Sequence, residues 1–307
     1  MDFITAALIV LGLVVFETIN SLDNAVINAE VLSTVSPKAR RWFLTWGMFF
    51  AVFLVRGLLP LLIVWVVIPG LGLWGALTAT FSNDPAVGAA IEHSGPVLLL
   101  GAGVFLTFLF LHWLFLETKR FGLWIERFFL VNGLWFYATV SIILATVVWF
   151  SLKVDPILAF GAVVGSSAFF IVHGFKENAE KAELSLRQGG GGRSDVSKIL
   201  FLEMIDTAFS IDGVLGAFAF TLSVPLILIG NGIGALMVRW LTIRNIESIK
   251  KYVFLKHGAM YSLVVLGGIM IADGFGAHIP EWLSPIVTFA IIGYFFLKSR
   301  RYLLMPQ

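Results

Sequence analysis

The chain has 307 residues, of which 59% are hydrophobic and only 13% are charged. A soluble domain of this length does not need so much apolar surface, so the composition indicates a membrane protein. There is no cysteine, which excludes disulfides, thiolate metal ligands and thiol nucleophiles, and the net charge of +2 becomes informative only when it is assigned to loops.

Apolar runs along the chain predict nine membrane-spanning helices, and the predicted fold class is therefore an all-α polytopic membrane protein. We expect the spans at residues 4–32, 42–68, 96–116, 128–150, 156–174, 199–222, 225–243, 253–272 and 284–299. The first residues carry neither a charged region nor a small-residue cleavage site. We therefore interpret residues 3–16 as a permanent membrane segment rather than a signal peptide.

Basic residues predict the orientation of the chain. Nearly all Lys and Arg residues lie in the loops that follow the first, third, fifth, seventh and ninth spans, whereas the opposite loops hold only Lys153. The positive-inside rule then places the N-terminus outside and the C-terminus in the cytoplasm of a cell with this protein in its plasma membrane. Because the basic residues follow the membrane side and not a groove, we expect no nucleic-acid partner.

Two similar stretches carry carboxylates inside apolar runs. ETINSLD at 17–23 and DTAFSID at 206–212 share an acid, a Thr, a Ser and an Asp at matching positions. A carboxylate inside a membrane marks a functional site by default. The first span runs inward and the sixth runs outward, so the two stretches are antiparallel. This pattern predicts two inverted repeats with a site at their junction.

The repeats divide the chain into five expected segments. These are a first three-helix repeat over 1–120, an inserted transmembrane hairpin over 121–174, a flexible cytoplasmic linker over 175–198, a second three-helix repeat over 199–272, and an additional C-terminal helix within 273–307. Matching residues in the second helix of each repeat support the division, because Gly47 precedes Arg56 by nine residues and Gly230 precedes Arg239 by nine. The linker is expected from its polar, charged and glycine-rich composition.

Helical geometry places the acids of the second stretch on two sides of one helix. Glu203, Asp206 and Ser210 fall on one face, whereas Asp212 falls on the opposite face. An Asp exposed to lipid costs several kcal/mol, so either Asp212 faces another protein helix or the helix unwinds beside Gly213. We favour unwinding, because the carbonyl oxygens it releases ligate cations in transporters with broken helices.

Charge balance indicates that the site attracts cations. Five carboxylates lie within the spans, at Glu17, Asp23, Glu203, Asp206 and Asp212. They outnumber the two arginines, Arg56 and Arg239, which we expect to pair with some of them. Asn, Ser and backbone oxygens are further candidate ligands or supports, at Asn20, Asn24, Ser21, Ser210 and Gly213. Hard oxygen ligands of this kind favour Mg²⁺, Ca²⁺ or Mn²⁺.

At these motifs the chain resembles the TerC/Alx family of integral membrane proteins, which is related to the LysE-type exporters. The similar segments are ETINSLDNAVINAEVL (17–32), VRGLL (55–59), EMIDTAFSIDGVLGAFAFT (203–221) and LKHGAMYSLVVLGGIMI (255–271). The chain departs from the family at Gly213, where many members have Ser, and in its inserted hairpin. The resemblance implies export of a divalent cation, most often Mn²⁺, by Glu17, Asp23, Asn24, Glu203, Asp206 and Asp212.

The predicted function is therefore transport of a divalent cation, Mn²⁺ first and Ca²⁺ second, with a proton as the expected counter-ion and no prosthetic group. We expect no enzymatic activity. Two alternatives remain open at this stage. One is a membrane scaffold or insertion factor whose acids pair internally, and the other is an intramembrane aspartyl protease, which needs two close acids that share a proton. The sequence leaves the ion, the driving force and the oligomeric state undecided.

Overall fold

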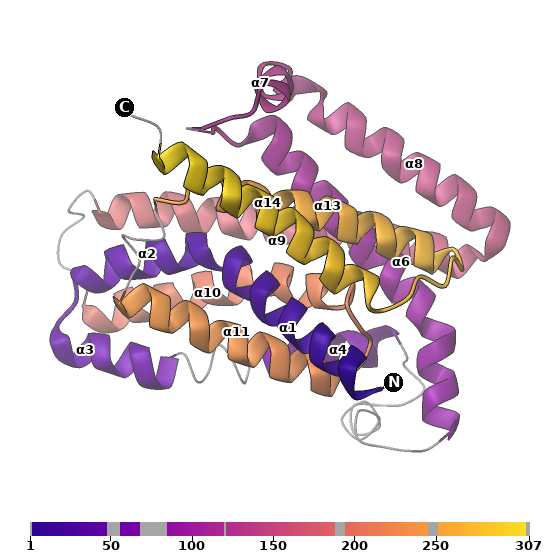
Figure 1. Cartoon of the computed structure of the whole chain (residues 1–307), viewed down its shortest axis with the longest axis horizontal. Coiled ribbons are helices and arrows are strands. Elements are labelled where there is room, and N and C mark those ends of the chain that lie inside the picture. The colour runs from indigo at the N-terminus through magenta and orange to yellow at the C-terminus, as the bar shows by residue number, and fades with distance from the viewer. Residues whose placement is uncertain are drawn as a thin grey trace.

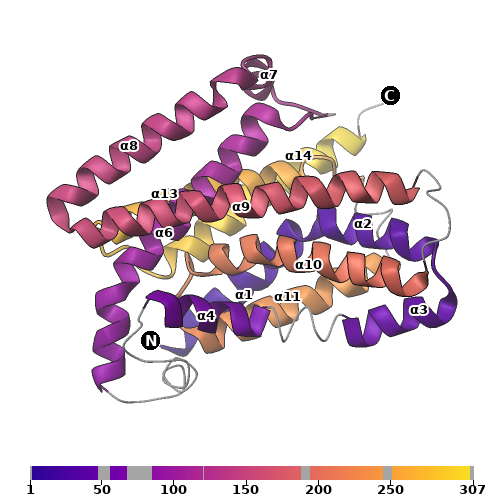
Figure 2. The ribbon, with the colours of Figure 1, turned by 180° about the vertical axis from the view of Figure 1, so that it is seen from behind.

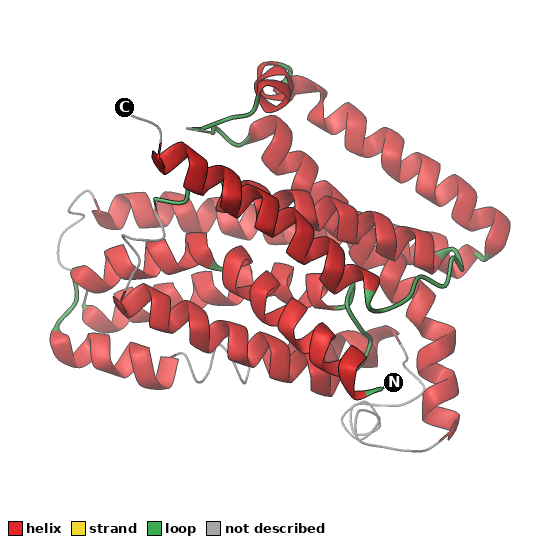
Figure 3. Cartoon of the chain, in the orientation of Figure 1, coloured by secondary structure: helices red, strands yellow, loops and turns green. Residues whose placement is uncertain are grey.

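The computed structural model of the chain describes residues 2–47, 56–67, 85–119, 121–187, 194–244 and 251–304. Within these ranges the regular structure is entirely helical (Figure 3). Six helices are long and apolar enough to cross a membrane, at Phe3–Asn20, His93–Leu116, Gly133–Val154, Pro156–Asn178, Val224–Leu241 and Leu255–Gly274. The prediction of an all-α, multi-pass membrane protein is confirmed at this level.

The described helices follow one another in a simple order (Figure 1). They are α1 (Phe3–Asn20), α2 (Leu22–Ser33), α3 (Pro37–Trp42), the π-helix η1 (Phe43–Gly47), α4 (Arg56–Val67), α6 (Pro85–Leu116), α7 (Trp124–Val131), the 3-10 turn η4 (Gly133–Trp135), α8 (Phe136–Val154), α9 (Pro156–Arg187), α10 (Asp195–Ala217), α11 (Val224–Arg244), α13 (Leu255–Gly274) and α14 (Leu283–Leu304). The expected span at 284–299 is helical, and the span at 199–222 is helical up to Ala217, but neither is among the six. Helix α10 carries three carboxylates in its apolar stretch.

The long helix α6 is the centre of the bundle. It packs on α13 along one side and on α9 along another, and α13 in turn packs on α14. Helix α1 packs on α11, and α10 contacts α9, α11 and the first three helices after α1. Helix α8 lies at the edge of the bundle, against α9 and α6, and Figures 1 and 2 show it leaning away from the other helices.

Glycines allow α6 to approach its two neighbours closely. A Cβ at Gly103 would lie 2.8 Å from the Gly267 carbonyl oxygen of α13, and a Cβ at Gly101 would lie 2.7 Å from the Gly161 carbonyl oxygen of α9. Small residues at helix crossings bring backbones together, which is how helices gain packing energy in lipid. The aromatic core beside these crossings includes Phe108 and Phe169, whose ring centroids lie 5.9 Å apart at 88°.

Three expected boundaries are wrong. The first span is not one helix, because the chain is interrupted at Ser21 between α1 and α2. Helix α6 begins at Pro85 and continues through Pro96, where a loop up to residue 95 was expected. Residues 175–187 are not a flexible linker but the end of α9. Their sequence, FKENAEKAELSLR, is rich in strong helix formers with acid and base four residues apart, which stabilises a helix in water.

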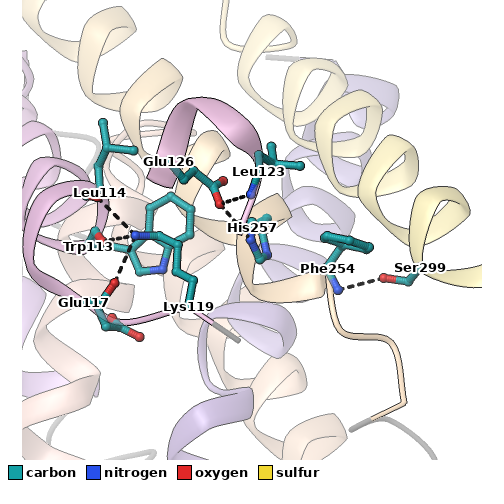
Figure 4. Close-up of polar contacts among 9 residues, drawn as sticks. All are labelled: Trp113, Leu114, Glu117, Lys119, Leu123, Glu126, Phe254, His257 and Ser299. Atoms are coloured by element: carbon teal, nitrogen blue, oxygen red, sulfur yellow. Dashed lines mark hydrogen bonds and ion pairs between the residues drawn. The ribbon is translucent and has the colours of Figure 1, made fainter. Parts of the chain in front are cut away.

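The short helix α7 is attached to α13 through a buried carboxylate. Its outer face exposes Trp124 and Phe128, whereas Glu126 is fully buried. Glu126 Oε2 accepts hydrogen bonds from the Leu123 N–H at 2.8 Å and from His257 Nε2 at 3.1 Å (Figure 4). Burial alone would raise the pKa of Glu126, but these hydrogen bonds hold that pKa below its ordinary value of 4.5.

The glycine crossing of α6 and α13 can be tested with two adjacent residues. Gly267→Ala is expected to lower the free energy of unfolding by about 1 to 3 kcal/mol, because the new methyl group overlaps α6. Gly268→Ala is the matched control, since its Cβ meets no atom within 4 Å and the helix gains propensity. Thermal unfolding in detergent measures both. Equal midpoints for the two variants would contradict the close crossing.

The Glu126 contact predicts an acid limit to stability. A carboxyl group with a lower pKa in the folded protein stabilises the fold above its ordinary pKa, and this contribution is lost as the pH falls through the folded value. The unfolding midpoint is therefore expected to drop below about pH 4.5, the ordinary pKa of this group. Glu126→Gln should be less stable than the wild type at pH 7 and should show a weaker drop in acid. An identical acid profile in both proteins would contradict this role.

Candidate functional site

One face of α10 carries the acids of the second motif. The helix is continuous from Asp195 to Ala217, so Glu203, Asp206, Ser210 and Gly213 succeed one another at intervals of three or four residues. This face measures about 15 Å from Glu203 to Gly213, at 1.5 Å per residue. The predicted face of Glu203, Asp206 and Ser210 is therefore confirmed, and we call it the acidic face of α10.

The acid of the first motif reaches the far end of this face. Glu17 of α1 is 1% exposed. Its Oε2 lies so close to Gly213 that any Cβ there would overlap it, and its Cβ and Cγ lie 2.7 and 2.8 Å from the place of a Cβ at Gly234 of α11. Ser21 Oγ donates a hydrogen bond of 2.6 Å to Glu17 Oε1. Three helices thus enclose one carboxylate, and two of them do so with glycine.

Glu203 occupies the other end of the acidic face. Its carboxyl group touches Gly47, the last residue of the π-helix η1, and its Cδ lies 3.1 Å from where a Cβ at Gly47 would be. Glu203 Oε1 is buried and receives no hydrogen bond from the described residues. A π-helical turn is costly for the backbone and occurs frequently at functional sites. The two carboxylates, Glu17 and Glu203, therefore mark two positions along α10.

The helix interruption lies in the first motif and not in the second. Ser21, between α1 and α2, adopts φ −89° and ψ 3°, and it stands between Glu17 and Asp23. The side chains of Asp23 and Asn24 lie outside the described residues, so their predicted role as ligands stays a prediction. Thr18 and Thr207 donate matching hydrogen bonds to the carbonyl four residues earlier, at 2.6 and 2.8 Å.

Asp212 does not belong to the acidic face. The favoured unwinding at Asp212 and Gly213 is wrong, because α10 continues through both residues. Asp212 instead points to α9, where it forms an ion pair with Lys176, and the two side chains are only 7% and 10% exposed. The alternative arrangement, in which Asp212 faces another protein helix, is therefore correct. Sequence analysis missed the partner because Lys176 was assigned to the linker.

A buried amide near Glu17 was also missed. Asn231 of α11 is 1% exposed, and neither its oxygen nor its nitrogen has a hydrogen-bond partner among the described residues. It lies three residues before Gly234, which contacts Glu17. The signal in the sequence is a single amide in the apolar run LILIGNGIGALM. Its carbonyl oxygen is a hard donor of the kind that divalent cations prefer, on the third helix that borders Glu17.

The remaining predicted residues are placed less completely. Asn20 ends α1 beside the interruption, and Ser210 Oγ donates a hydrogen bond of 2.6 Å to the Asp206 carbonyl oxygen. Arg239 is half-buried on α11, and the side chain of Arg56 lies outside the described residues, so their pairing with acids stays a prediction. Within the described part of the chain, no three His, Asp or Glu side chains come close enough to hold one metal ion.

The ion pair between Lys176 and Asp212 predicts a large and specific loss of stability. Lys176→Met leaves a buried carboxylate without its cation and should cost about 3 to 5 kcal/mol. Adding Asp212→Asn to this variant should recover part of the loss, because the uncompensated charge is removed. Thermal unfolding of both single variants and the double variant measures the coupling. Additive losses would contradict a direct pair.

Comparison with known proteins places the chain in a family. Residues 22–303 match the model of a family described as "Protein of unknown function (DUF475)". Neither the curated proteins nor the solved structures contain a match to the chain. The match begins just after Ser21 and extends almost to the end of α14, so it includes the whole second motif and, of the first motif, only Leu22 and Asp23. The chain belongs to the DUF475 family.

Proposed function

We propose that this protein is a transporter that exports a divalent cation across the plasma membrane along the acidic face of α10. The observation that carries the proposal is the position of Glu17. This acid of the first half is buried against Gly213 of the second half, directly after the other copy of the motif. A buried carboxylate at the junction of two halves is the arrangement in which membrane transporters bind ions.

The donor set favours a hard divalent cation. Glu17, Glu203, Asp206 and the Asn231 amide offer only oxygen ligands, and the chain has no cysteine. Oxygen sites of this kind bind Mn²⁺, Ca²⁺ and Mg²⁺ in preference to softer metals. Mn²⁺ is the first candidate because of the resemblance to the TerC/Alx family, and Ca²⁺ is the second. Asp212 is removed from the proposed ligands because Lys176 already neutralises it.

Reciprocal packing supports the two inverted repeats. Helix α1 packs on α11 while α10 packs on η1 and α4, and the third helices of the two halves, α6 and α13, pack on each other. At the same crossings, Leu13 of α1 contacts Gly230, and Glu203 of α10 contacts Gly47. Each first helix thus meets the equivalent glycine of the opposite half. Nine spans, two of them the inserted α8 and α9, complete the proposed arrangement.

The proposed route follows from the orientation. With the N-terminus outside and the C-terminus in the cytoplasm, α10 runs outward, so Glu203 and Asp206 meet a cytoplasmic cation first and Glu17 meets it second. The two halves then rock against each other and open the Glu17 end to the outside. Exchange of a proton on one of these carboxylates would provide the counter-ion. None of these steps requires enzymatic chemistry.

Metal flux into proteoliposomes that contain the full-length protein tests the proposal. Glu17→Gln is expected to slow Mn²⁺ flux by about 10- to 100-fold, because a ligand loses its charge while its shape is kept. Gly213→Ala should also slow the flux, since the methyl group displaces the Glu17 carboxylate and leaves every charge in place. Asp155→Asn is the matched control. Asp155 caps the Ile157 N–H in the turn before α9, and Asn can do the same.

The outcomes separate the proposal from the scaffold alternative. Unchanged flux in Glu17→Gln would remove Glu17 from the pathway. An absence of Mn²⁺, Ca²⁺ and Mg²⁺ flux through folded wild-type protein would overturn transport as a whole. It would instead favour a membrane scaffold whose acids pair internally, as Asp212 does with Lys176. Internal pH recorded in the same vesicles determines whether protons are exchanged.

A further inference from the structure

Two cavities adjoin where α6 ends and α13 begins. The first, of about 400 Å³, lies between the helix interruption of the first motif, the end of α6 and the first turn of α13. The second, of about 370 Å³, continues from it along α14, between the ends of α1 and α11 and the start of α13. Both are lined by Ile19, Leu22, Tyr252 and Leu255. They therefore form one cavity with two arms.

The arm beside α14 is apolar. Apart from the shared residues it is lined by Leu241, Phe289, Ile292, Gly293 and Phe296. None of the described residues that line this arm is charged, so they offer nothing to a hydrated ion. Its apolar walls suit a hydrocarbon chain.

The arm at the end of α6 is positively charged. Among the described residues its lining includes Lys119, Lys256 and one carboxylate, Glu117, which pairs with Lys256. Lys119 Nζ donates to the carbonyl oxygens of Trp113, Leu114 and Glu117 at 2.7, 3.1 and 3.1 Å, so the negative end of α6 is neutralised (Figure 4).

The first turn of α13 adds to this positive potential. Leu255, Lys256 and His257 line the cavity, so the N-terminal end of the helix, with its partial positive charge, opens onto it. His257 is 5% exposed and uses Nε2 to bond Glu126, while its buried Nδ1 has no hydrogen-bond partner among the described residues. A divalent cation would be repelled from this arm, which is therefore not its entrance. The electrostatics favour an anion.

We propose that this cavity binds one anionic phospholipid of the surrounding membrane. The headgroup phosphate lies at Lys256 and the first turn of α13, and an acyl chain follows the apolar arm beside Gly293. Basic pockets between membrane helices bind anionic headgroups in this way. Tyr252 lines both arms and so lies where they join. Amphipathic tyrosine rings are common at the headgroup level of a membrane, which is where a lipid headgroup meets its acyl chains. The inference does not depend on cation transport.

In this position the lipid would support the helix interruption beside the first motif. Ile19, Asn20 and Leu22 line the cavity and flank the interruption at Ser21. Ser21 holds Glu17 through its hydroxyl group. A lipid in the cavity would thus support the chain beside the interruption, and membrane composition would affect the stability of the first motif.

Lipid titration of the full-length protein, purified and delipidated in a neutral detergent, tests the proposal. Dioleoyl phosphatidylglycerol is expected to raise the thermal unfolding midpoint saturably. Dioleoyl phosphatidylcholine has the same acyl chains and shows whether the chains alone raise the midpoint. Glycerol phosphate shows whether a soluble phosphate is sufficient. Equal effects of the two lipids would reduce the site to ordinary lipid contact, and an equal effect of glycerol phosphate would make it a site for soluble phosphates. Either result would overturn the proposal.

Two matched pairs of variants assign the arms. Lys256→Gln and Glu117→Gln break the same ion pair, but only the first should weaken phosphatidylglycerol binding, by about fivefold, because it alone removes positive charge. Gly293→Leu should block the apolar arm and weaken phosphatidylglycerol binding, and it should be tolerated because a Cβ there meets no atom within 4 Å. Gly268→Leu is the control. Its Cβ is equally unobstructed, on the exposed surface of α13, and it should leave phosphatidylglycerol binding unchanged. Equal weakening within either pair would contradict the assignment of that arm.

Discussion

A carboxylate in an apolar helix bundle has to find its partners within the protein, because the surrounding hydrocarbon offers none. This requirement determines much of the helix arrangement. Asp212 joins α10 to α9 through Lys176, Glu126 joins α7 to α13 through His257, and Glu17 is enclosed by its own helix, α10 and α11. Each contact connects segments that are far apart in the sequence. The acids therefore specify which helices pack together, whereas contacts between apolar faces are less specific.

Glycine provides the space that these acids need. Glycine lets a carboxylate lie directly against the backbone of a neighbouring helix, and Glu17 and Glu203 both lie against glycines, at Gly213, Gly234 and Gly47. The same residue type lets α6 cross α13 at Gly103 and Gly267. Close helix approach and acid placement therefore depend on one property, the absence of Cβ. For this reason the two motifs lie in helices whose neighbours are rich in glycine.

Sequence patterns predicted the parts of the structure that depend on local properties. Hydropathy identified the long apolar helices, and the 3.6-residue period separated Asp212 from Glu203 and Asp206 on α10. The choice between unwinding and pairing for Asp212 depended on a residue 36 positions away, and no local pattern identifies such a partner. The interruption at Ser21 had no glycine or proline to signal it. Asn231 could have been found as a lone amide in an apolar run, but its closeness to Glu17 comes only from helix packing.

The two sides of α10 differ in how they are held to the neighbouring helices. On one side the ion pair with Lys176 fixes the helix to α9, which is itself packed on α6 through glycine contacts. On the other side the acidic face meets Glu17 of α1 and Gly47 of η1, and large side chains such as Phe16 of α1 pack on α10 beside these contacts. Separating a buried ion pair is costly, because it leaves an uncompensated charge inside the protein. We therefore expect α9 and α10 to stay together in any rearrangement of the helices. In that case the acid that looked like a misplaced ligand in the sequence, Asp212, holds the fixed side of the helix along which the cation would move.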